Sequence, residues 1–282
     1  MNRPRSECIA TSSGLANTQH LPYPRRGEVQ SRCERVSITS RHLRQAVQEH
    51  GYAVVPEALP QSAVDSLVAA LAEATKAPAV SQRRQGDYAM RNLLQLVPAV
   101  RALAASPELR ALVEPVIGAE AFAVRGLFFD KTPGANWKVT WHQDFAIAVQ
   151  RRVEVCGFGP WSVKAGVVHV QPPAEVLEKM LTVRVHLDDC DESNGPLQVL
   201  PGSHRAGKLS AEEIRAWRAR VPAVTCCVSR GGAVLMRPLL LHASSPARQP
   251  AHRRVVHLEF AAGPLPGGLE WCEGHYSKAQ LK

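Results

Sequence analysis

The chain has 282 residues, of which 45% are hydrophobic and 21% charged, and its formal net charge is +9. This apolar fraction excludes a largely disordered chain, and the lack of an apolar run of about 18 residues argues against a membrane-spanning helix. The seven cysteines are an odd number in a long chain, which argues against a secreted disulfide framework, and the lack of a Cys-x-x-Cys pair argues against a zinc ribbon. The positive charge leaves nucleic acid or a small anion open as partner.

The first 35 residues differ from the rest of the chain. Residues 1–35 are polar, contain prolines and lack apolar periodicity, which predicts a flexible arm. They contain no apolar stretch like that of a signal peptide, so we expect a cytoplasmic protein. We expect residues 36–282 to form a single domain, since a chain of that length can bury one large core.

Helical periodicity dominates the first part of this domain. Apolar residues at helical spacing predict a first helix that ends at Gly51, followed by a short strand over Tyr52–Val55. Ser62, with Asp65 three residues later, resembles a capping box that would begin a second helix. We expect a third helix over Ala99–Leu112.

The second part of the domain has the pattern of a β protein. Short segments rich in Val, Leu and Phe alternate with Gly, Pro, Asn and Asp, which favours strands and turns. Helices followed by strands predict an antiparallel sandwich or barrel with helices packed outside it. The expected strands are Ala121–Asp130, Leu181–Asp188, Gln198–Leu200, Val221–Val228, Gly232–Met236 and Arg254–Ala261.

A candidate metal site begins with His142 and Asp144. They stand two residues apart, and on an extended strand such side chains point to the same face. His242, at the end of a strong strand pattern, is the best candidate for a third ligand. Two histidines and one carboxylate form a facial triad that leaves open positions on an octahedral ion, which suits Fe(II) handling a co-substrate and O₂. A His-x-Asp pair alone also arises by chance as an ordinary surface pair.

A candidate carboxylate site accompanies the distal histidine. Arg253 lies eleven residues after His242, and Ser244 lies two residues after it. A guanidinium can bind the far carboxylate of a dicarboxylic co-substrate bidentately, and a serine hydroxyl can donate to the same group. Arg254 is expected to face the opposite way, since side chains alternate along a strand.

These features together resemble the phytanoyl-CoA dioxygenase family, whose members are Fe(II)- and 2-oxoglutarate-dependent oxygenases on a double-stranded β-helix. The resemblance spans about residues 39–262 and depends on the order and spacing of several pieces more than on any single one. The pieces are Trp141–Asp144, Asn194–Leu197, Pro201–His204, and His242–Ser244 with Arg253.

The resemblance implies a fold, a cofactor set and a reaction. The fold would be mainly β with α, a jelly-roll or cupin-like core with helices packed outside it. His142, Asp144 and His242 would bind Fe(II), and Arg253 with Ser244 would bind 2-oxoglutarate. The enzyme would use O₂ to hydroxylate or otherwise oxidise an unactivated C–H bond of a small molecule, giving succinate and CO₂. Related halogenases replace the carboxylate ligand by a small residue, so Asp144 favours a hydroxylase.

The resemblance also brings further basic residues to the cavity. Arg91 would be the basic residue that family members place on an early strand near the co-substrate. Arg184 would face inward, Arg125 likewise, and two such arginines would indicate an anionic substrate, since a buried charge is costly without a partner. The alternative is that both form structural pairs, Arg184 with Asp188 and Arg125 with Asp130.

Other residues are expected around the mouth of the cavity. The insertion over residues 150–173 would form a lid, so Trp161 would shape substrate choice. Lys131, Trp137 and Lys138 flank the metal strand and would line the mouth, with Lys138 contacting substrate. His257 lacks a partner at ligand spacing and is expected in the core or on the surface. We therefore expect a small-molecule partner, neither nucleic acid nor membrane.

Two other classes of protein compete with this interpretation. The first is another metalloenzyme on a cupin-like barrel, which would use a third ligand at other spacing and would have no use for Arg253. The second is a non-catalytic relative that binds a ligand. An intact triad argues against the second class, because a binding module has no need of an open metal site.

Overall fold

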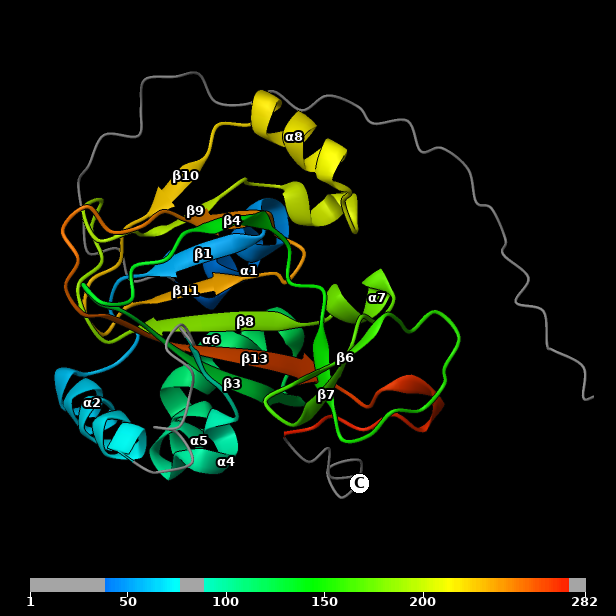
Figure 1. Cartoon of the computed structure of the whole chain (residues 1–282), viewed down its shortest axis with the longest axis horizontal. Helices are drawn as coiled ribbons and strands as arrows, with labels where there is room; N and C mark the ends of the chain where they lie inside the picture. Colours follow the sequence, from blue (N-terminus) through cyan, green and yellow to red (C-terminus); the bar gives the residue numbers. More distant parts are fainter. Residues whose placement is uncertain (1–38, 77–88, 274–282) are drawn as a thin grey trace, which may run out of the picture. The chain divides into compact units, whose positions relative to one another are not determined.

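The computed structural model describes residues 39–76 and 89–273, and the arm predicted over residues 1–35 lies outside this range. Two facing antiparallel sheets form the core within the described residues (Figure 1). The larger sheet has the order β1 (Tyr52–Val55), β11 (Ala233–Met236), β8 (Leu181–His186), β13 (Arg253–Ala262), β3 (Ala121–Lys131) and β2 (Ala89–Met90). The smaller has the order β10 (Val224–Cys226), β9 (Leu197–Val199), β12 (His242–Ser244) and β4 (Val139–His142).

The alternation of side chains along β8 and β11 gives the large sheet two different faces. Val183 and Leu235 join the core that packs against the helices, whereas Val234 and Met236 pack against residues of β9 and β10. Arg184, next to Val183 on β8, lines the cavity between the sheets. The large sheet therefore has an apolar outer face under the helices and a partly polar inner face, as a jelly-roll core with outer helices requires.

Helices cover the outer face of the large sheet (Figure 1). Each buries aliphatic side chains there, and full burial of one such side chain contributes about 1.5–3 kcal/mol. The helices of this group are α1 (Ser40–His50), α2 (Gln61–Lys76), α4 (Leu93–Leu96), α5 (Pro98–Ala104) and α6 (Pro107–Ile117). Elsewhere lie α7 (Ala174–Leu177), α8 (Ala211–Arg220), η1 (Ser203–Ala206) and η2 (Pro266–Gly268). The expected architecture is thus confirmed as a double-stranded β-helix.

Two local helix predictions differ from the structure. The second helix begins at Gln61 rather than at a Ser62 cap, because the carbonyl of Pro60 already accepts the first helical hydrogen bonds. The third predicted helix is two helices, α5 and α6. Ser106 caps the second of them through the N–H of Leu109, and Pro107 cannot donate the hydrogen bond that a continuous helix needs.

The insertion over residues 150–173 contains a β-hairpin. Its strands β6 (Trp161–Lys164) and β7 (Val167–Val170) pair with each other, and β7 also pairs with β5 (Ile147–Val149). This third sheet buries Val149 and Val170 with Trp271 in an apolar cluster of its own. Pairing with β5 therefore holds the hairpin next to the segment that follows β4.

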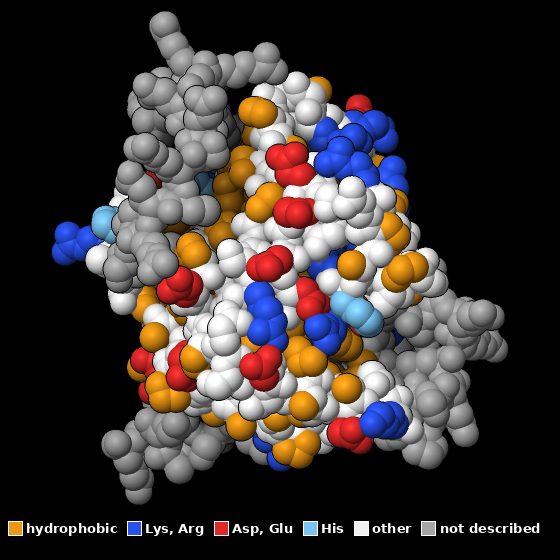
Figure 2. Space-filling view, turned by 90° about the vertical axis from the view of Figure 1, so that its left-hand side faces the viewer, with side chains coloured by type: hydrophobic (Ala, Val, Ile, Leu, Met, Phe, Trp, Pro, Cys, Tyr) orange, Lys and Arg blue, Asp and Glu red, His pale blue; other side chains and the backbone are white. Residues whose placement is uncertain are grey.

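Two features of the described residues bear on possible partners: the lengths of the helices and the distribution of charge on the face drawn in Figure 2. Among residues 39–76 and 89–273, no helix is both long and apolar enough to cross a membrane. Figure 2 shows acidic, basic and apolar side chains interspersed over much of one face, with basic side chains grouped near its upper right. On that face the positive charge is divided among separate places.

Candidate active site

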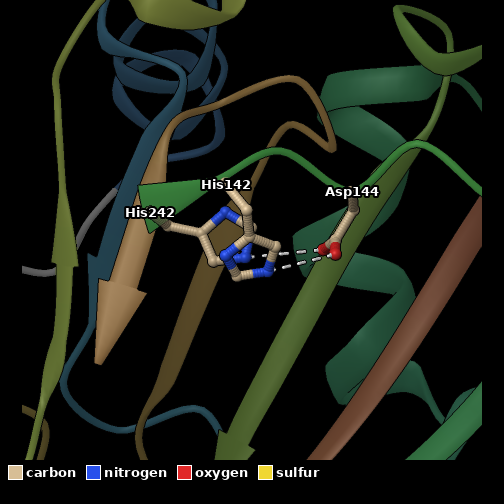
Figure 3. Close-up of side chains that lie close together, drawn as sticks. All are labelled: His142, Asp144 and His242. Atoms are coloured by element: carbon tan, nitrogen blue, oxygen red, sulfur yellow. Dashed lines mark ion pairs between the residues drawn. The ribbon is translucent and has the colours of Figure 1, made fainter. Parts of the chain in front are cut away.

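Three side chains predicted as metal ligands lie together between the two sheets (Figure 3). His142 and His242 are register partners on β4 and β12, so their imidazoles lie side by side with centroids 4.1 Å apart. Asp144 follows β4, and its oxygens lie 3.7 Å from Nε2 of His142 and 3.6 Å from Nε2 of His242. All three donor atoms lie within 4.8 Å of one another.

Backbone contacts orient both imidazoles. Nδ1 of His142 donates to the carbonyl of Thr140, and Nδ1 of His242 donates to the carbonyl of Leu240, each over 2.8 Å. A carbonyl only accepts, so each ring holds its proton on Nδ1 and presents a lone pair on Nε2. Both lone pairs face the carboxylate of Asp144.

Electrostatics keep these donors in metal-binding form. Burial works to raise the pKa of Asp144, but His242, His257, His142 and Arg125 outweigh it and lower that pKa to about 2. Burial, opposed by the charge of Asp144, lowers the pKa of His242 to about 4. At neutral pH the cluster therefore contains an ionised carboxylate and a neutral imidazole on His242, which are the forms that bind a divalent metal.

Buried polar side chains hold the ligands in place. Gln143 donates to the carbonyls of Gly207 and Leu239 and accepts from the N–H of Leu209. The hydroxyl of Ser203, in the Pro-Gly-Ser-His turn, accepts from the N–H of Leu241. The residues next to the ligands are thus fixed by bonds that leave the ligand atoms themselves unused.

The cluster fits a divalent metal ion. The contacts of 3.6 and 3.7 Å between the carboxylate and the imidazoles are longer than hydrogen bonds, so these atoms do not satisfy one another directly. Two imidazole nitrogens and one carboxylate oxygen on one side of an ion match the facial triad of non-haem iron sites. The remaining side opens into a cavity of about 440 Å³.

Arg253 and Ser244 lie together at one end of this cavity. The guanidinium of Arg253 donates to Oγ of Ser244 over 3.1 Å and to the carbonyl of Gly195. The fully buried Lys131, the register partner of Arg253 on β3, donates to the same Oγ over 2.8 Å and to the carbonyl of Ser245. Two buried cations thus meet at one hydroxyl with no carboxylate bonded to either among the described residues.

Arg254 faces the other side of its strand, as alternation predicts. It donates to both carboxylate oxygens of Asp188 over 2.9 and 2.5 Å. The alternative pair of Arg184 with Asp188 therefore does not form. The expected strand Leu181–Asp188 ends at His186, so the alternation along β8 does not extend to Asp188.

Arg125 and Arg184 both line the cavity, and each has a partner on β13. Arg125 donates to Oε1 of Glu259, its register partner, over 2.9 Å, so the alternative pair with Asp130 does not form either. Arg184 donates to Nδ1 of His257, its register partner, over 2.8 Å. Since Nδ1 accepts, His257 carries its proton on Nε2, which lies 3.5 Å from Glu259.

Other sequence-predicted residues occupy different places around the cavity. Arg91 and Trp137 line it. Lys138 is exposed, and Trp161 packs in the apolar cluster of the third sheet. Neither residue lines the cavity. Lys164, on the same hairpin as Trp161, does line the cavity, and no sequence pattern singled it out.

The family to which the chain belongs follows from a comparison with family models. The model of the phytanoyl-CoA dioxygenase family matches residues 47–255, which include the triad and Arg253. The chain belongs to this family.

Individual relatives support the same placement. The chain is 26% identical over 170 residues to the ectoine dioxygenase of Bordetella parapertussis, a match that covers 57% of this chain and 48% of the relative. The chain thus spans about half the length of the curated relatives it matches. The ectoine dioxygenase of Bordetella bronchiseptica matches over the same length at the same identity.

Solved structures share the fold. One is a non-haem α-ketoglutarate-dependent carbocyclase from nogalamycin biosynthesis, with TM-score 0.62, 17% identity and coverage of 80% of this chain and 87% of that chain. Another is EctD from S. alaskensis with 2-oxoglutarate and 5-hydroxyectoine, with TM-score 0.62, 20% identity and coverage of 81% and 79%. A third is AviO1 from Streptomyces viridochromogenes, with TM-score 0.59, 23% identity and coverage of 82% and 100%.

Proposed function

We propose that this protein is an Fe(II)- and 2-oxoglutarate-dependent oxygenase that oxidises a C–H bond of a small molecule. His142, Asp144 and His242 would hold Fe(II), and Arg253 would bind the distal carboxylate of 2-oxoglutarate. The observation that carries the proposal is the pairing of an open three-ligand cluster with a buried arginine in one cavity. A bare metal-binding site would have no use for that arginine.

The residues around Arg253 are built to receive a carboxylate. Arg253 and Lys131 are both buried, and they converge on Ser244. Burying two cations side by side is costly unless an anion enters. The distal carboxylate of 2-oxoglutarate would accept hydrogen bonds from these groups, and its other end would reach toward the triad.

In this proposal the protein contributes the positions of the metal ligands and of the co-substrate to the reaction. When bound with 2-oxoglutarate, Fe(II) supplies the O₂ chemistry that yields succinate and CO₂ and oxidises the substrate. The protein positions the co-substrate through Arg253 and orients the ligands through the carbonyls of Thr140 and Leu240. Asp144 occupies the carboxylate position, which favours hydroxylation over halogenation.

The proposal is tested by anaerobic addition of Fe(II) and 2-oxoglutarate to the purified protein. We expect a weak visible charge-transfer band in the wild type and its loss in His142→Ala. The exposed His252, which pairs with Asp130 outside the cavity, provides a matched control, and His252→Ala should keep the band. A well-folded wild type that gives no band would refute the oxygenase proposal.

A different metalloenzyme on the same barrel makes a different prediction. Such an enzyme would be indifferent to 2-oxoglutarate, and Arg253→Met would leave its metal chemistry unchanged. The buried position of Arg253 beside Lys131 favours the oxygenase. Measuring succinate release in the presence of O₂ separates the two.

A further inference from the structure

The cavity has two cationic ends on opposite sides of the triad. At one end Arg253 pairs with Lys131 across β13 and β3, and at the other Glu259 pairs with Arg125 across the same two strands. The six residues from position 253 to position 259 span roughly 20 Å on a strand. A five-carbon diacid is far shorter than this distance, so one 2-oxoglutarate cannot serve both ends.

The triad lies between these ends. Ser244, which contacts Arg253, pairs with Val139 on the side of β4 that precedes the ligands. Arg125 reaches toward the carbonyl of Ala146, at 3.5 Å, on the side that follows Asp144. A co-substrate bound from Arg253 to the triad therefore leaves the Arg125 end to another molecule.

Three cations gather at the Arg125 end. Arg125, Arg91 and Lys164 all line the cavity, and they come from β3, the segment after β2, and the hairpin β6–β7. Burial, followed by the charges of Arg125 and Arg91, lowers the pKa of Lys164, which indicates that the three positive charges lie near one another. Arg91, which the sequence predicts near the co-substrate, is thus placed by its charge interaction with Lys164 at the Arg125 end of the cavity.

At the Arg125 end of the cavity, acidic side chains are fewer than basic ones. Apart from the ligand Asp144, Glu259 is the one carboxylate among the described residues that line the cavity, and it is bonded to Arg125. Glu273 lies near Arg125 but accepts from the N–H groups of Gly126 and Gln95 and does not line the cavity. Lys164 has no ion-pair partner among the described residues, so it is available to a ligand.

We propose that Arg125, Lys164 and Arg91 bind an oxyanion group of the substrate, a carboxylate or a phosphate, and that the oxidised C–H bond lies between this group and the triad. The substrate class is then a small molecule with an anionic group at one end and a carbon skeleton against the apolar lining of Leu127 and Phe145. This inference deepens the proposed function and rests on it for the reaction, but the anion site itself can be tested separately.

The test is calorimetric titration of the protein with three small probes in the presence of Mn(II) and saturating 2-oxoglutarate. The probes are phenylacetate, phenyl phosphate and the neutral phenylacetamide. We expect at least one anion to bind about tenfold more tightly than the amide, because hydrogen bonds to a charged group are stronger than hydrogen bonds to a neutral one. The two anions distinguish a carboxylate site from a phosphate site. Equal binding of the amide, or no binding of either anion, would overturn the proposal.

Variants locate the binding within the cavity. Lys164→Gln should weaken the preferred anion about tenfold and leave the amide unchanged. Lys179→Gln removes the same charge from an exposed lysine outside the cavity and should have no effect. Because Arg125→Gln alone would leave Glu259 buried without its partner, the double variant Arg125→Gln/Glu259→Gln is used to test that pair. Unchanged anion affinity in Lys164→Gln would contradict the assignment.

A second titration separates this inference from the proposed oxygenase activity. Metal-free Arg253→Met lacks the cation expected to hold 2-oxoglutarate but keeps the Arg125 end intact. Preferential anion binding that persists in this variant and is lost on adding Lys164→Gln would support the second site even if the wild type gave no charge-transfer band. Loss of all anion binding in Arg253→Met alone would place the anion at the co-substrate end and refute the inference.

Discussion

At the scale of single residues, the most informative arrangement is the pair of buried cations at Ser244. Arg253 was recognisable from the sequence because it follows His242 by eleven residues, at the start of the next strand. The role of Lys131 beside it was not, because that contact depends on the register between β13 and β3. The roles of Arg253 and Lys131 can therefore be tested by separate substitutions.

Arg253→Met should raise the KM for 2-oxoglutarate by roughly thirtyfold or more, because removing one partner of a buried charge pair costs about 2–5 kcal/mol. Arg253→Lys should recover part of this loss, since it restores the charge but not the bidentate geometry. Arg254→Met is the matched control, because Arg254 bonds to Asp188 outside the cavity. The measurement is succinate formation against 2-oxoglutarate concentration, and a normal KM in Arg253→Met would contradict the assignment.

Lys131 should make the binding of 2-oxoglutarate depend on pH. Burial and the adjacent Arg253 lower the pKa of Lys131 to about 7, so its amine is protonated below this pH and neutral above it. An incoming carboxylate prefers the protonated form, so affinity should fall as pH rises from 6.5 to 8.5, by at most about tenfold per unit. Lys131→Met should bind 2-oxoglutarate more weakly at pH 6.5 and lose this pH dependence. The dissociation constant, measured anaerobically across this range, checks it.

The positions of the two cavity arginines were predictable from the sequence, but their hydrogen-bond partners were not. Both Arg125 and Arg184 were expected to face the cavity, and both do. Their expected acidic partners lay nearby in sequence, whereas the actual partners, Glu259 and His257, are 134 and 73 residues away. Such pairs follow from strand register, which hydrophobic periodicity alone does not determine.

At the scale of elements, some bounds were predicted closely and others were not: the first helix ends at Gly51 as expected, whereas the strand expected over Val221–Val228 is only β10. Alternation and turn residues placed Tyr52–Val55 as it is and Ala121–Asp130 to within one residue of β3. The break between α5 and α6 is itself local, since Ser106 and Pro107 are a cap and a helix start. The hairpin β6–β7 was expected only as a lid, because both strands are short and β6 is largely exposed.

Trp161 should act on substrate binding through this hairpin. Its side chain packs against the apolar cluster of the third sheet rather than lining the cavity, so Trp161→Ala should loosen the strand that carries Lys164. We expect a loss of about 1–3 kcal/mol in unfolding free energy, since the ring is only partly buried. Anion binding should weaken while 2-oxoglutarate affinity stays unchanged.

The neighbouring Val163 provides the control for this prediction. It lies on the same strand with 68% of its surface exposed, so Val163→Ala should change stability by less than about 0.5 kcal/mol. Limited proteolysis and chemical denaturation report the loosening, and calorimetry reports the two affinities. A Trp161→Ala protein with normal stability and normal anion binding would show that the hairpin does not depend on this ring.

At the scale of the whole molecule, the two sheets divide stability from function. The outer face of the large sheet is apolar and carries the helices, whereas its inner face contributes Arg184, His257 and Glu259 to the cavity. The fold was predictable because this division appears as strand alternation and as the order of helices and strands. Burying charged groups on the inner face costs stability that ligands can restore on binding.

Metal binding should therefore stabilise the folded protein. A ligand that binds only the folded state contributes about 2.7 kcal/mol at a concentration one hundred times its Kd, which corresponds to a rise of about 5–10 °C in Tm for a domain of this size. We expect Mn(II) to raise Tm, EDTA to reverse the rise, and 2-oxoglutarate to add to it. His242→Ala should abolish the response to Mn(II), whereas His252→Ala should retain it, because the exposed His252 pairs with Asp130. An equal rise in both variants would show that the metal binds elsewhere.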